Sequence, residues 1–372
     1  MRIGIDYTPA VRQRAGIGRY TRGLVHALLQ LDAENVYRLL IPGDALYADS
    51  KFTRSFARAP LTEHQLVILW QRLRIPLPVE LVTGPVDIFY SPDFVLPPTH
   101  ARYKFLTVHD FSYVRVPECH YPGNLLYLNS AVPRAVKQAD LILADSNSTK
   151  NDLAEIYGVP PERIRTLYSG VEGHFRPVSD VNESARVRAK YNLTRPFILS
   201  VGTLEPRKNY ERLIQAFARM GAGTDCELLI AGGKGWLFDP ILAAPAKFGV
   251  SERVRFLGFV PDEDLPALYS LTRLFVYPSL YEGFGLPVLE AMVCGAPTVT
   301  ANNSSLPEVA GDACLLVDAR NVDELTTTME KGLVQEELRQ TMKEKGFAQA
   351  KKFSWEASAV TLRDAFETMA VR

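Results

Sequence analysis

Short apolar runs alternate with amphipathic helical patterns along almost the whole of this 372-residue chain. The runs have the length of strands, and the stripe of Leu213, Ile214 and Phe217 between two of them has helical spacing. Such alternation predicts parallel sheets that are covered by helices on both faces. The predicted strands are Ile3–Asp6, Arg38–Ile41, Asp87–Tyr90, Lys104–His109, Leu141–Ala144 and Arg165–Tyr168, then Phe197–Gly202, Glu227–Ala231, Val254–Leu257, Leu274–Tyr277 and Thr298–Thr300.

These eleven candidate strands are many for one open sheet. Residues 172–196 separate them into two series, because this stretch mixes charge with Pro177 and Pro196 and has little periodicity. We therefore predict an α/β protein of two Rossmann-like domains that face each other across a cleft. The first would span residues 1–178 and the second residues 190–353, with a helix at about 354–372 that packs back on the first domain.

The chain has 42 basic and 42 acidic residues, so its net charge is zero. A protein that binds nucleic acid usually has a basic excess, so we expect no nucleic-acid partner. No apolar run is long enough for a transmembrane helix, and four dispersed cysteines favour a reducing compartment. We expect a cytoplasmic protein. Leu66–Trp70 and the arginines after it could form a membrane-surface helix of the N-terminal domain, which would place the protein at the inner face of the membrane. A core helix with solvated arginines is the favoured alternative.

Ligands of open parallel sheets bind beyond the carboxyl ends of the strands. The loop 202–209 follows a predicted strand and carries Arg207 and Lys208. Asn209 is a suitable N-cap for the helix after it, so two cations would lie beside free helix amides. A diphosphate is a natural ligand for such a site, although a solvated Arg-Lys pair at the end of a loop is equally common.

A second loop carries Glu282 and Glu290 around a Gly-Phe-Gly-Leu-Pro sequence. Glycines at 283 and 285 let the backbone approach a ligand, and Pro287 suits the first turn of a helix. The amides at a helix N-terminus keep nearby carboxylates ionised, and ionised carboxylates only accept hydrogen bonds. The pattern therefore favours binding of sugar hydroxyls over a capping role for the two glutamates.

His109 and a glycine loop are weaker signals. His109 closes a predicted strand, where it could donate a hydrogen bond or orient a ligand, but a lone histidine is more often structural. Gly16 and Gly18 open a helix near Arg19 without the third glycine of a dinucleotide fingerprint. Four arginines, Arg12, Arg14, Arg19 and Arg22, make this end basic and suited to an anion. We interpret Asp262 of the Asp-Glu-Asp triplet as a helix cap, and expect no metal site.

Together these motifs resemble the family-four retaining glycosyltransferases of GT-B architecture, over nearly the whole chain. The matching positions are Gly16-Ile17-Gly18, His109-Asp110, Tyr277-Pro278-Ser279, the pair Glu282 and Glu290 with seven residues between them, and residues 304–309. Residues 202–209 are most similar to a bacterial mannosyltransferase-like branch, which commonly uses GDP-mannose to extend surface polysaccharides. Many relatives have an arginine where this chain has Thr203, so Arg207 would take over its phosphate contact.

The resemblance implies transfer of a hexose with retention, without metal or cofactor. Arg207 and Lys208 would neutralise the leaving diphosphate of a nucleotide-sugar donor, helped by the Gly16 loop and by the amides of Phe284, Gly285 and Leu286. Glu290 would hold the ribose, Glu282 the sugar hydroxyls, and His109 the transferred sugar or the acceptor hydroxyl. The sequence offers no evident carboxylate nucleophile, which favours front-face attack over double displacement. The acceptor would be a glycan or a lipid-linked glycan.

Three other classes remain as alternatives. A GT-B epimerase would share the sheets and act on a nucleotide sugar without an acceptor. A two-domain sugar-binding protein would bind without turnover, and the absence of a secretory signal argues against it. An NAD-dependent dehydrogenase would need the full glycine fingerprint.

Overall fold

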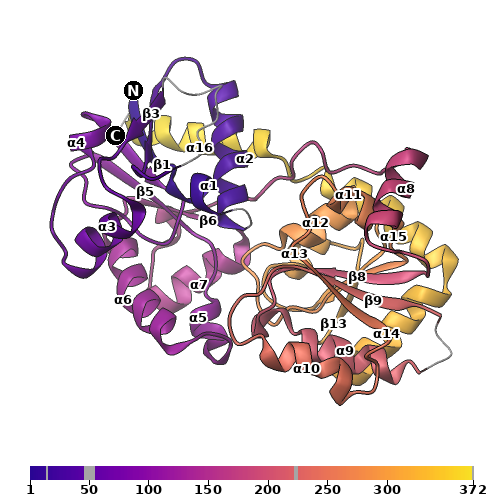
Figure 1. The fold of residues 1–372 in the computed structure, drawn as a ribbon. Coiled ribbons are helices and arrows are strands. Elements are labelled where there is room, and N and C mark those ends of the chain that lie inside the picture. Colours follow the sequence, from indigo (N-terminus) through magenta and orange to yellow (C-terminus); the bar gives the residue numbers. More distant parts are fainter. Residues whose placement is uncertain (14–15, 46–54, 222–224, 371–372) are drawn as a thin grey trace. The chain divides into compact units, whose positions relative to one another are not determined.

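The computed structural model describes residues 1–13, 16–45, 55–221 and 225–370 (Figure 1). The chain forms two compact units. The first unit comprises Met1–Phe111, Gly123–Gly170 and Phe353–Arg372, and the second comprises Ser112–Pro122 and Val171–Lys352. Each unit contains one parallel sheet with helices against it, so the prediction of two Rossmann-like α/β domains is confirmed.

The first unit is built on a seven-stranded sheet of order β3-β2-β1-β4-β5-β6-β7. All of its neighbouring strands are parallel, and Ile3 of β1 lies opposite Tyr37 and Ile88. The strands are β1 (Arg2–Asp6), β2 (Val36–Ile41), β3 (Phe56–Arg58), β4 (Ile88–Ser91), β5 (Tyr103–Val108), β6 (Leu141–Ala144) and β7 (Ile164–Thr166).

Helices cover both faces of this sheet, because successive strand residues point to opposite sides. Leu39 and Ile88 belong to a core shared with α2 and α16, whereas Leu40 and Phe89 belong to a second core that contains Leu66. The helices are α1 (Thr8–Arg12), α2 (Ile17–Leu31), α3 (Glu63–Val67), the π-helix Ile68–Arg72, α4 (Glu80–Thr83), α6 (Pro122–Gln138), α7 (Asn147–Tyr157), the 3₁₀ turn Pro161–Arg163 and α16 (Trp355–Ala370).

The C-terminal helix α16 packs on α2 in the first unit (Figure 1). The Trp355 ring lies edge-on to the Tyr20 ring, with 5.8 Å between the centroids. Phe366 packs against Phe105 of the sheet in the same way at 5.0 Å. These aromatic contacts bury the apolar stripe of α16 and fix the end of the described chain on the domain where it also begins.

The second unit is built on a six-stranded parallel sheet of order β10-β9-β8-β11-β12-β13. The strands are β8 (Phe197–Val201), β9 (Glu227–Ala231), β10 (Val254–Gly258), β11 (Leu274–Tyr277), β12 (Thr298–Ala301) and β13 (Leu315–Val317). The helices are α5 (Ser112–Arg115), the 3₁₀ turn Pro117–Cys119, α8 (Val181–Lys190), the 3₁₀ turn Pro206–Lys208, α9 (Tyr210–Arg219), α10 (Asp239–Lys247), α11 (Leu265–Leu271), α12 (Leu286–Val293), α13 (Leu306–Ala310), α14 (Val322–Val334) and α15 (Glu336–Ala350).

The chain departs from the predicted domain boundaries in two places. Residues 112–122 group with the second unit, where the Trp236 indole donates to the Cys119 carbonyl oxygen at 2.7 Å. The predicted linker 172–196 is not irregular throughout, because α8 lies within it. Asp180 caps this helix through the Asn182 amide, a signal that the charged composition of the segment concealed.

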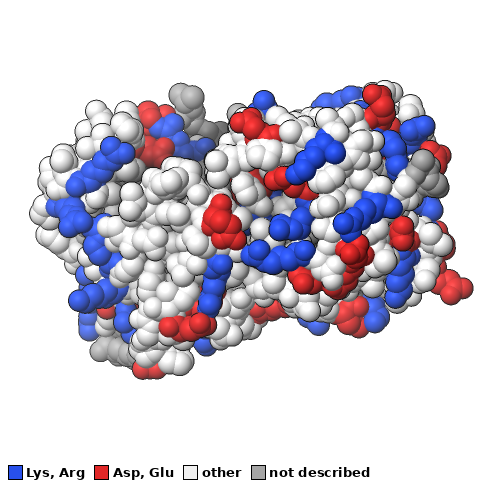
Figure 2. Space-filling view, turned by 90° about the horizontal axis from the view of Figure 1, so that it is seen from below, with Lys and Arg blue, Asp and Glu red and all other residues white. Residues whose placement is uncertain are grey.

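Charged side chains of both signs are interspersed on the face shown in Figure 2, which agrees with the balanced composition. Among the described residues, no helix combines the length and the apolar character that crossing a membrane requires. The cysteines are all free thiols, and three of them are buried. These are Cys119, Cys226 and Cys294.

Candidate active site

Arg207 and Lys208 lie in a 3₁₀ turn between β8 and α9, at the carboxyl end of the central strand of the second sheet. Both side chains are largely buried, and both point to one carboxylate. Arg207 contacts Glu282 at 2.7 Å between Nη1 and Oε2, and Lys208 contacts it at 2.6 Å between Nζ and Oε1. The structure therefore brings together the two predicted cations and one of the two predicted glutamates.

Two further groups complete this cluster. The Tyr277 hydroxyl, at the end of β11, accepts from Lys208 at 2.5 Å and donates to Glu282 at 2.9 Å. Glu205 accepts from Arg207 at 2.6 Å, and the Arg207 guanidinium also donates to the Tyr281 carbonyl oxygen at 2.8 Å. Two cations and two carboxylates thus balance each other at the ends of two adjacent strands.

The electrostatics of this cluster favour ionised groups despite their burial. Burial alone would raise the pKa of Glu282, but Arg207 and Lys208 lower that pKa to about 2. Burial and the neighbouring Arg207 lower the pKa of Lys208, which Glu282 and Glu205 oppose. The cluster can therefore exchange one anion for another, since an anionic ligand that reaches Lys208 and Arg207 takes the place of an internal carboxylate.

Asn209 does not cap α9 with its side chain, contrary to the prediction. Its backbone is left-handed, with φ of 62°, and no side-chain cap bond forms. The side-chain amide instead donates to the carbonyl oxygens of Pro278 and Ala319, at 3.0 and 2.7 Å. Asn209 therefore links the turn that carries Lys208 to the loop that follows β11. This link keeps the two cations close to Glu282.

The loop before α12 has the geometry that its sequence predicts. Gly285 is the N-cap with φ of 112°, where a side chain would be strained and would meet Leu306 at 2.8 Å. Ser305 donates to the carbonyl oxygens of Glu282 and Phe284, at 3.0 and 2.8 Å. Ser305 thereby fixes the backbone of this loop, and the amides of Val288 and Leu289 donate to the Gly285 carbonyl oxygen at 2.9 and 3.3 Å. Leu286 is the first residue of α12.

Glu290 lies in the second turn of α12 and is almost fully buried, at 1% exposure. Its Oε2 accepts a hydrogen bond from the Tyr269 hydroxyl at 3.0 Å. The two glutamates of the motif therefore differ in their surroundings, since Glu282 is paired with cations and Glu290 with a phenol.

His109 lies in the first unit, directly after β5, with both ring nitrogens engaged. Nδ1 contacts Asp145 Oδ2 at 2.7 Å, and Nε2 contacts the Pro92 carbonyl oxygen at 2.9 Å. The rings of Tyr20 and Phe94 lie edge-on to the imidazole at 4.9 and 5.4 Å. Since both partners are acceptors, both nitrogens carry protons in this arrangement.

The charge of His109 follows from these partners. Burial alone would lower the pKa of His109, but the Asp145 carboxylate, assisted by Asp93 and the Pro92 carbonyl, raises it to about 9. At neutral pH the side chain is therefore an imidazolium. It can supply positive charge or donate a hydrogen bond, but it is not a free general base.

The Gly16 loop has a local structural role. Gly16 is the N-cap of α2, and a side chain at Gly18 would meet the Gln13 carbonyl oxygen at 1.9 Å. The basic character expected here is largely offset. Arg12 pairs with Asp44 and Glu63, and Arg22 donates to the carbonyl oxygens of Ala10 and Gln13. Arg14 lies outside the described residues.

The Asp-Glu-Asp triplet at residues 262–264 precedes α11 but does not cap it as predicted. The N-cap position belongs to Asp264 rather than Asp262, and no side-chain cap bond forms there. Asp264 instead accepts from Lys190 and Tyr191 at 2.5 and 2.7 Å, and pairs with Arg186 at 2.7 Å. The triplet therefore anchors α8 on α11.

Sequence reasoning missed several carboxylates at the sheet ends. Glu205 is adjacent to the predicted cations, and Asp145 follows β6, next to the strand that carries His109. Asp6 is the last residue of β1, and burial together with Asp93 raises the pKa of Asp6 to about 6. A polar residue at the end of a predicted strand or directly after it was the signal that could have found Asp6 and Asp145, because parallel strands end at one edge of the sheet.

Comparison with known proteins shows which family the chain resembles. The model of glycosyl transferases group 1 matches residues 181–349, and that of glycosyltransferase family 4 matches residues 14–173. The O-antigen chain mannosyltransferase B of Escherichia coli is 38% identical over 76% of this chain and 74% of its own. A GDP-mannose-dependent alpha-(1-6)-phosphatidylinositol monomannoside mannosyltransferase of Mycolicibacterium smegmatis is 27% identical over 87% of this chain and 86% of its own.

The fold of the chain also resembles that of known structures. A sucrose-phosphate synthase from Thermosynechococcus elongatus superimposes with a TM-score of 0.77 at 20% identity, over 100% of this chain and 99% of that chain. Two parallel α/β domains with these sheet-end residues define a GT-B enzyme that acts on glycosyl groups. The chain belongs to the family-four glycosyltransferases, and the resemblance inferred from its motifs is confirmed.

Proposed function

We propose that this glycosyltransferase moves mannose from GDP-mannose to a glycan or lipid-linked acceptor in the synthesis of a surface polysaccharide such as O-antigen. The observation that carries the proposal is the pairing of Arg207 and Lys208 with Glu282 at the end of the second sheet. The mannosyltransferases to which the chain is similar support the choice of sugar, and one of them is named for its dependence on GDP-mannose.

The proposed role of the two cations is stabilisation of the leaving diphosphate. When the bond between the anomeric carbon and the phosphate oxygen breaks, negative charge grows on the diphosphate. Fixed cations in a buried site stabilise that charge without reorganisation, so we propose transfer without a metal or other cofactor. The Gly16 loop and the amides of Phe284, Gly285 and Leu286 would add hydrogen-bond donors. Arg207 would supply the phosphate contact for which Thr203 is too short.

Glu282 has two successive partners in this proposal. In the ligand-free cluster it is the counter-ion of Lys208 and Arg207. A diphosphate would take over both cations, and the released carboxylate, with its low pKa, would accept hydrogen bonds from hydroxyls of the transferred sugar. Glu290 would accept from the ribose hydroxyls. Binding of the donor thereby prepares the group that positions its sugar.

His109 would act as a cation rather than as a base. Its imidazolium, fixed by Asp145, would donate to the transferred sugar or align the acceptor hydroxyl. With no carboxylate assigned as a nucleophile, we propose front-face attack with retention, in which the departing phosphate oxygen accepts the proton of the acceptor hydroxyl.

We also propose that the first unit contacts the inner face of a membrane when the acceptor is linked to a lipid. The segment after α3 exposes apolar side chains next to Arg72 and Arg74, in particular Leu73 at 61% exposure and Ile75 at 40%. Leu66 is the one buried residue of α3, so this segment is more exposed to solvent than the core helix that its sequence favours. Apolar and basic side chains together suit an anionic lipid surface.

A GT-B epimerase is the second candidate, since it would share the nucleotide-sugar site. Thermal stabilisation by GDP-, UDP- and dTDP-sugars identifies the donor, because a ligand at 100 times its dissociation constant adds about 2.7 kcal/mol. We expect GDP-mannose to give the largest shift. Release of GDP that requires an acceptor distinguishes transfer from epimerisation, and stabilisation by none of the three would contradict the proposed donor class.

A further inference from the structure

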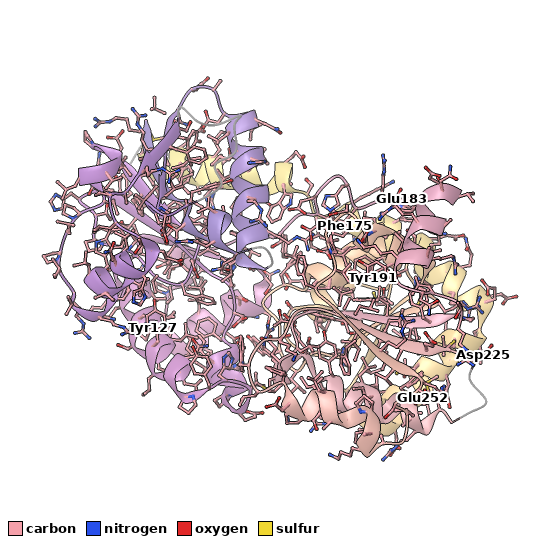
Figure 3. All side chains as sticks on the ribbon, in the orientation of Figure 1. Tyr127, Phe175, Glu183, Tyr191, Asp225 and Glu252 are labelled. Atoms are coloured by element: carbon pink, nitrogen blue, oxygen red, sulfur yellow. The ribbon has the colours of Figure 1, made fainter. Side chains whose placement is uncertain are left out.

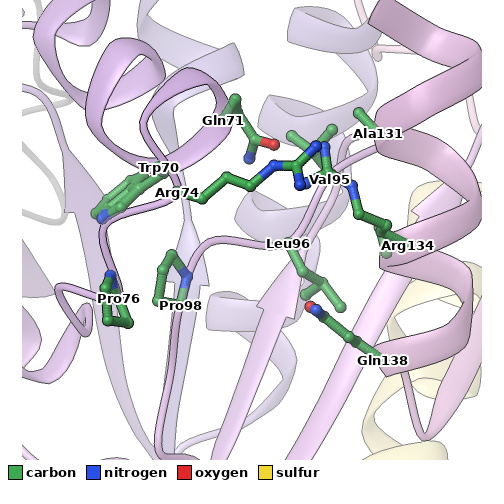
Figure 4. Close-up of a pocket in the computed structure, with 11 residues that line it drawn as sticks. Trp70, Gln71, Arg74, Pro76, Val95, Leu96, Pro98, Ala131, Arg134 and Gln138 are labelled. Atoms are coloured by element: carbon green, nitrogen blue, oxygen red, sulfur yellow. The ribbon is translucent and has the colours of Figure 1, made fainter.

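A cavity of about 290 Å³ lies in the first unit, and none of the candidate active-site residues lines it. Its walls come from the end of the π-helix and the loop after it, from the loop 95–98 and from α6 (Figure 4). Trp70, Gln71, Arg74, Arg134 and Gln138 supply its polar and aromatic groups. Its size suits a small ligand or one part of a longer ligand.

Two arginines give this cavity an unbalanced positive charge. The guanidinium ends of Arg74 and Arg134 point toward each other over the cavity in Figure 4. None of the eleven described lining residues is acidic, and neither arginine is in an ion pair with another described residue. The Nε of Arg134 donates to the Ser130 carbonyl oxygen at 2.9 Å, which anchors the side chain on α6.

Three other arginines of the first unit have partners within the protein. Arg2 pairs with Asp87 and Arg12 with Asp44 and Glu63, while Arg163 donates to the Val136 carbonyl oxygen. Arg74 differs in its backbone too, since its φ of 54° is left-handed and unfavourable for any residue with a side chain. Arg74 is exposed and is in no ion pair with a described residue, so its guanidinium is available to a ligand.

We propose that this cavity binds a phosphoryl group of the sugar acceptor. Planar guanidinium groups match the oxygens of phosphate in pairs of hydrogen bonds, and two of them facing one cavity suit a phosphodiester or diphosphate. The amides of Gln71 and Gln138 are additional donors, and Trp70 and the prolines supply apolar walls.

A neighbouring cavity of about 190 Å³ explains why the phosphoryl group belongs to the acceptor. Trp70, Gln71 and Val95 line both cavities. The neighbour is acidic, since Asp6 and Asp93 line it, so it accepts hydrogen bonds from hydroxyls and repels phosphate. A sugar in the acidic cavity and a phosphoryl group at the arginines together form a glycosyl phosphate.

Aromatic side chains of the acidic cavity suit a sugar as well. Tyr127 projects from α6 (Figure 3) and lines this cavity together with Trp70. Aromatic faces pack against the apolar faces of sugar rings, while carboxylates bind the hydroxyls around the rim. The assignment of this ligand as an acceptor rests on the proposed glycosyl transfer, whereas the binding of a phosphoryl group does not.

Titration with inorganic pyrophosphate tests the cavity directly. The double variant Arg74→Gln, Arg134→Gln removes both charges, and Arg38→Gln is the matched control, since Arg38 is an exposed arginine of β2 in the same unit and lines neither cavity. We expect the double variant to lose one binding event, with affinity at this site reduced about tenfold or more, and the control to bind as the wild type does. Replacement of both arginines by lysine should restore part of the affinity.

Equal stoichiometry and affinity in the wild type, the double variant and the control would overturn the proposal. Binding at Arg207 and Lys208 does not confuse the result, because it is common to all three proteins. If the chain transfers no sugar but the double variant still loses a pyrophosphate site, the proposed function fails while the phosphoryl site stands.

Kinetics distinguish an acceptor phosphate from a lipid headgroup. For a water-soluble glycosyl phosphate acceptor, the double variant should raise the acceptor KM about tenfold or more and leave the donor KM unchanged. The matched glycoside without phosphate should show no change. Loss of binding only to phosphatidylglycerol-containing vesicles, with the acceptor KM unchanged, would assign the arginines to a headgroup and overturn the acceptor assignment.

Discussion

Lys208 and Glu282 are joined by an ion pair of 2.6 Å although 74 residues separate them in the sequence. One residue follows β8 and the other follows β11, and these strands are neighbours in the sheet. Arg207 contacts the other oxygen of the same carboxylate. The protein thus carries a carboxylate in the place where the proposed donor has its diphosphate.

Removal of the lysine should weaken donor binding. Lys208→Ala takes away one of two cations, and we expect GDP affinity to fall about tenfold or more and transfer to fall about a hundredfold or more. The matched control is Lys247→Ala, because Lys247 is exposed on α10. Calorimetric titration with GDP provides the comparison, and wild-type affinity in the Lys208 variant would refute the assignment.

Neutralisation of the glutamate should separate binding from turnover. Glu282→Gln keeps the size of the side chain but removes the internal competitor for Lys208 and Arg207. We expect GDP to bind at least as tightly as in the wild type, while kcat falls about a hundredfold or more, since the sugar loses its carboxylate. Glu211→Gln, on exposed α9 surface, is the control. A clear fall in GDP affinity in the Glu282 variant would contradict the proposed exchange of anions.

His109 should matter for turnover and not for nucleotide binding. It lies in the first unit, whereas Lys208, Glu282 and Glu290 lie in the second. We expect His109→Ala to lower kcat about a hundredfold and to leave GDP affinity nearly intact. Single-turnover rates, GDP affinity and melting temperature are measured on the same variant. A variant that melts early yet transfers at the wild-type rate when cold would assign His109 to packing alone.

The same histidine should make stability depend on pH. Its pKa is about 9 in the folded protein and 6.5 ordinarily, so the folded state binds the proton more tightly than the unfolded state. The resulting stability, about 3 kcal/mol, is fully present below pH 6.5 and is lost as the pH rises through 9. Melting temperature should therefore fall less steeply between these pH values in His109→Gln than in the wild type. Parallel curves for the two proteins would contradict the ion pair with Asp145.

The sequence was sufficient to predict most of the two sheets. The predicted strands Leu141–Ala144, Glu227–Ala231 and Leu274–Tyr277 have the observed bounds, because fully buried strands are continuous apolar runs. The strands that were missed, β3 and β13, are both at sheet edges and only three residues long. So short a run has no periodicity to detect, and only pairing with the neighbouring strand defines it.

The candidate site was predictable in its residue types and not in its pairings. Strand ends and glycine turns indicated Lys208, Glu282 and His109 from local pattern alone. The ion pairs of Glu282 with the two cations and of His109 with Asp145 depend on which strands are neighbours, and no local pattern contains that order. The side chain of Asn209 shows the same limit, because its partners follow other strands.

The most direct test of the account is the product formed from GDP-α-mannose and a mannose-terminated acceptor in the presence of EDTA. We predict release of GDP only when the acceptor is present, one mannosyl group transferred for each GDP, and an α linkage in the product by NMR. GDP release that does not require the acceptor, a β linkage, or complete loss of transfer that Mg²⁺ or Mn²⁺ restores would contradict metal-independent mannosyl transfer with retention.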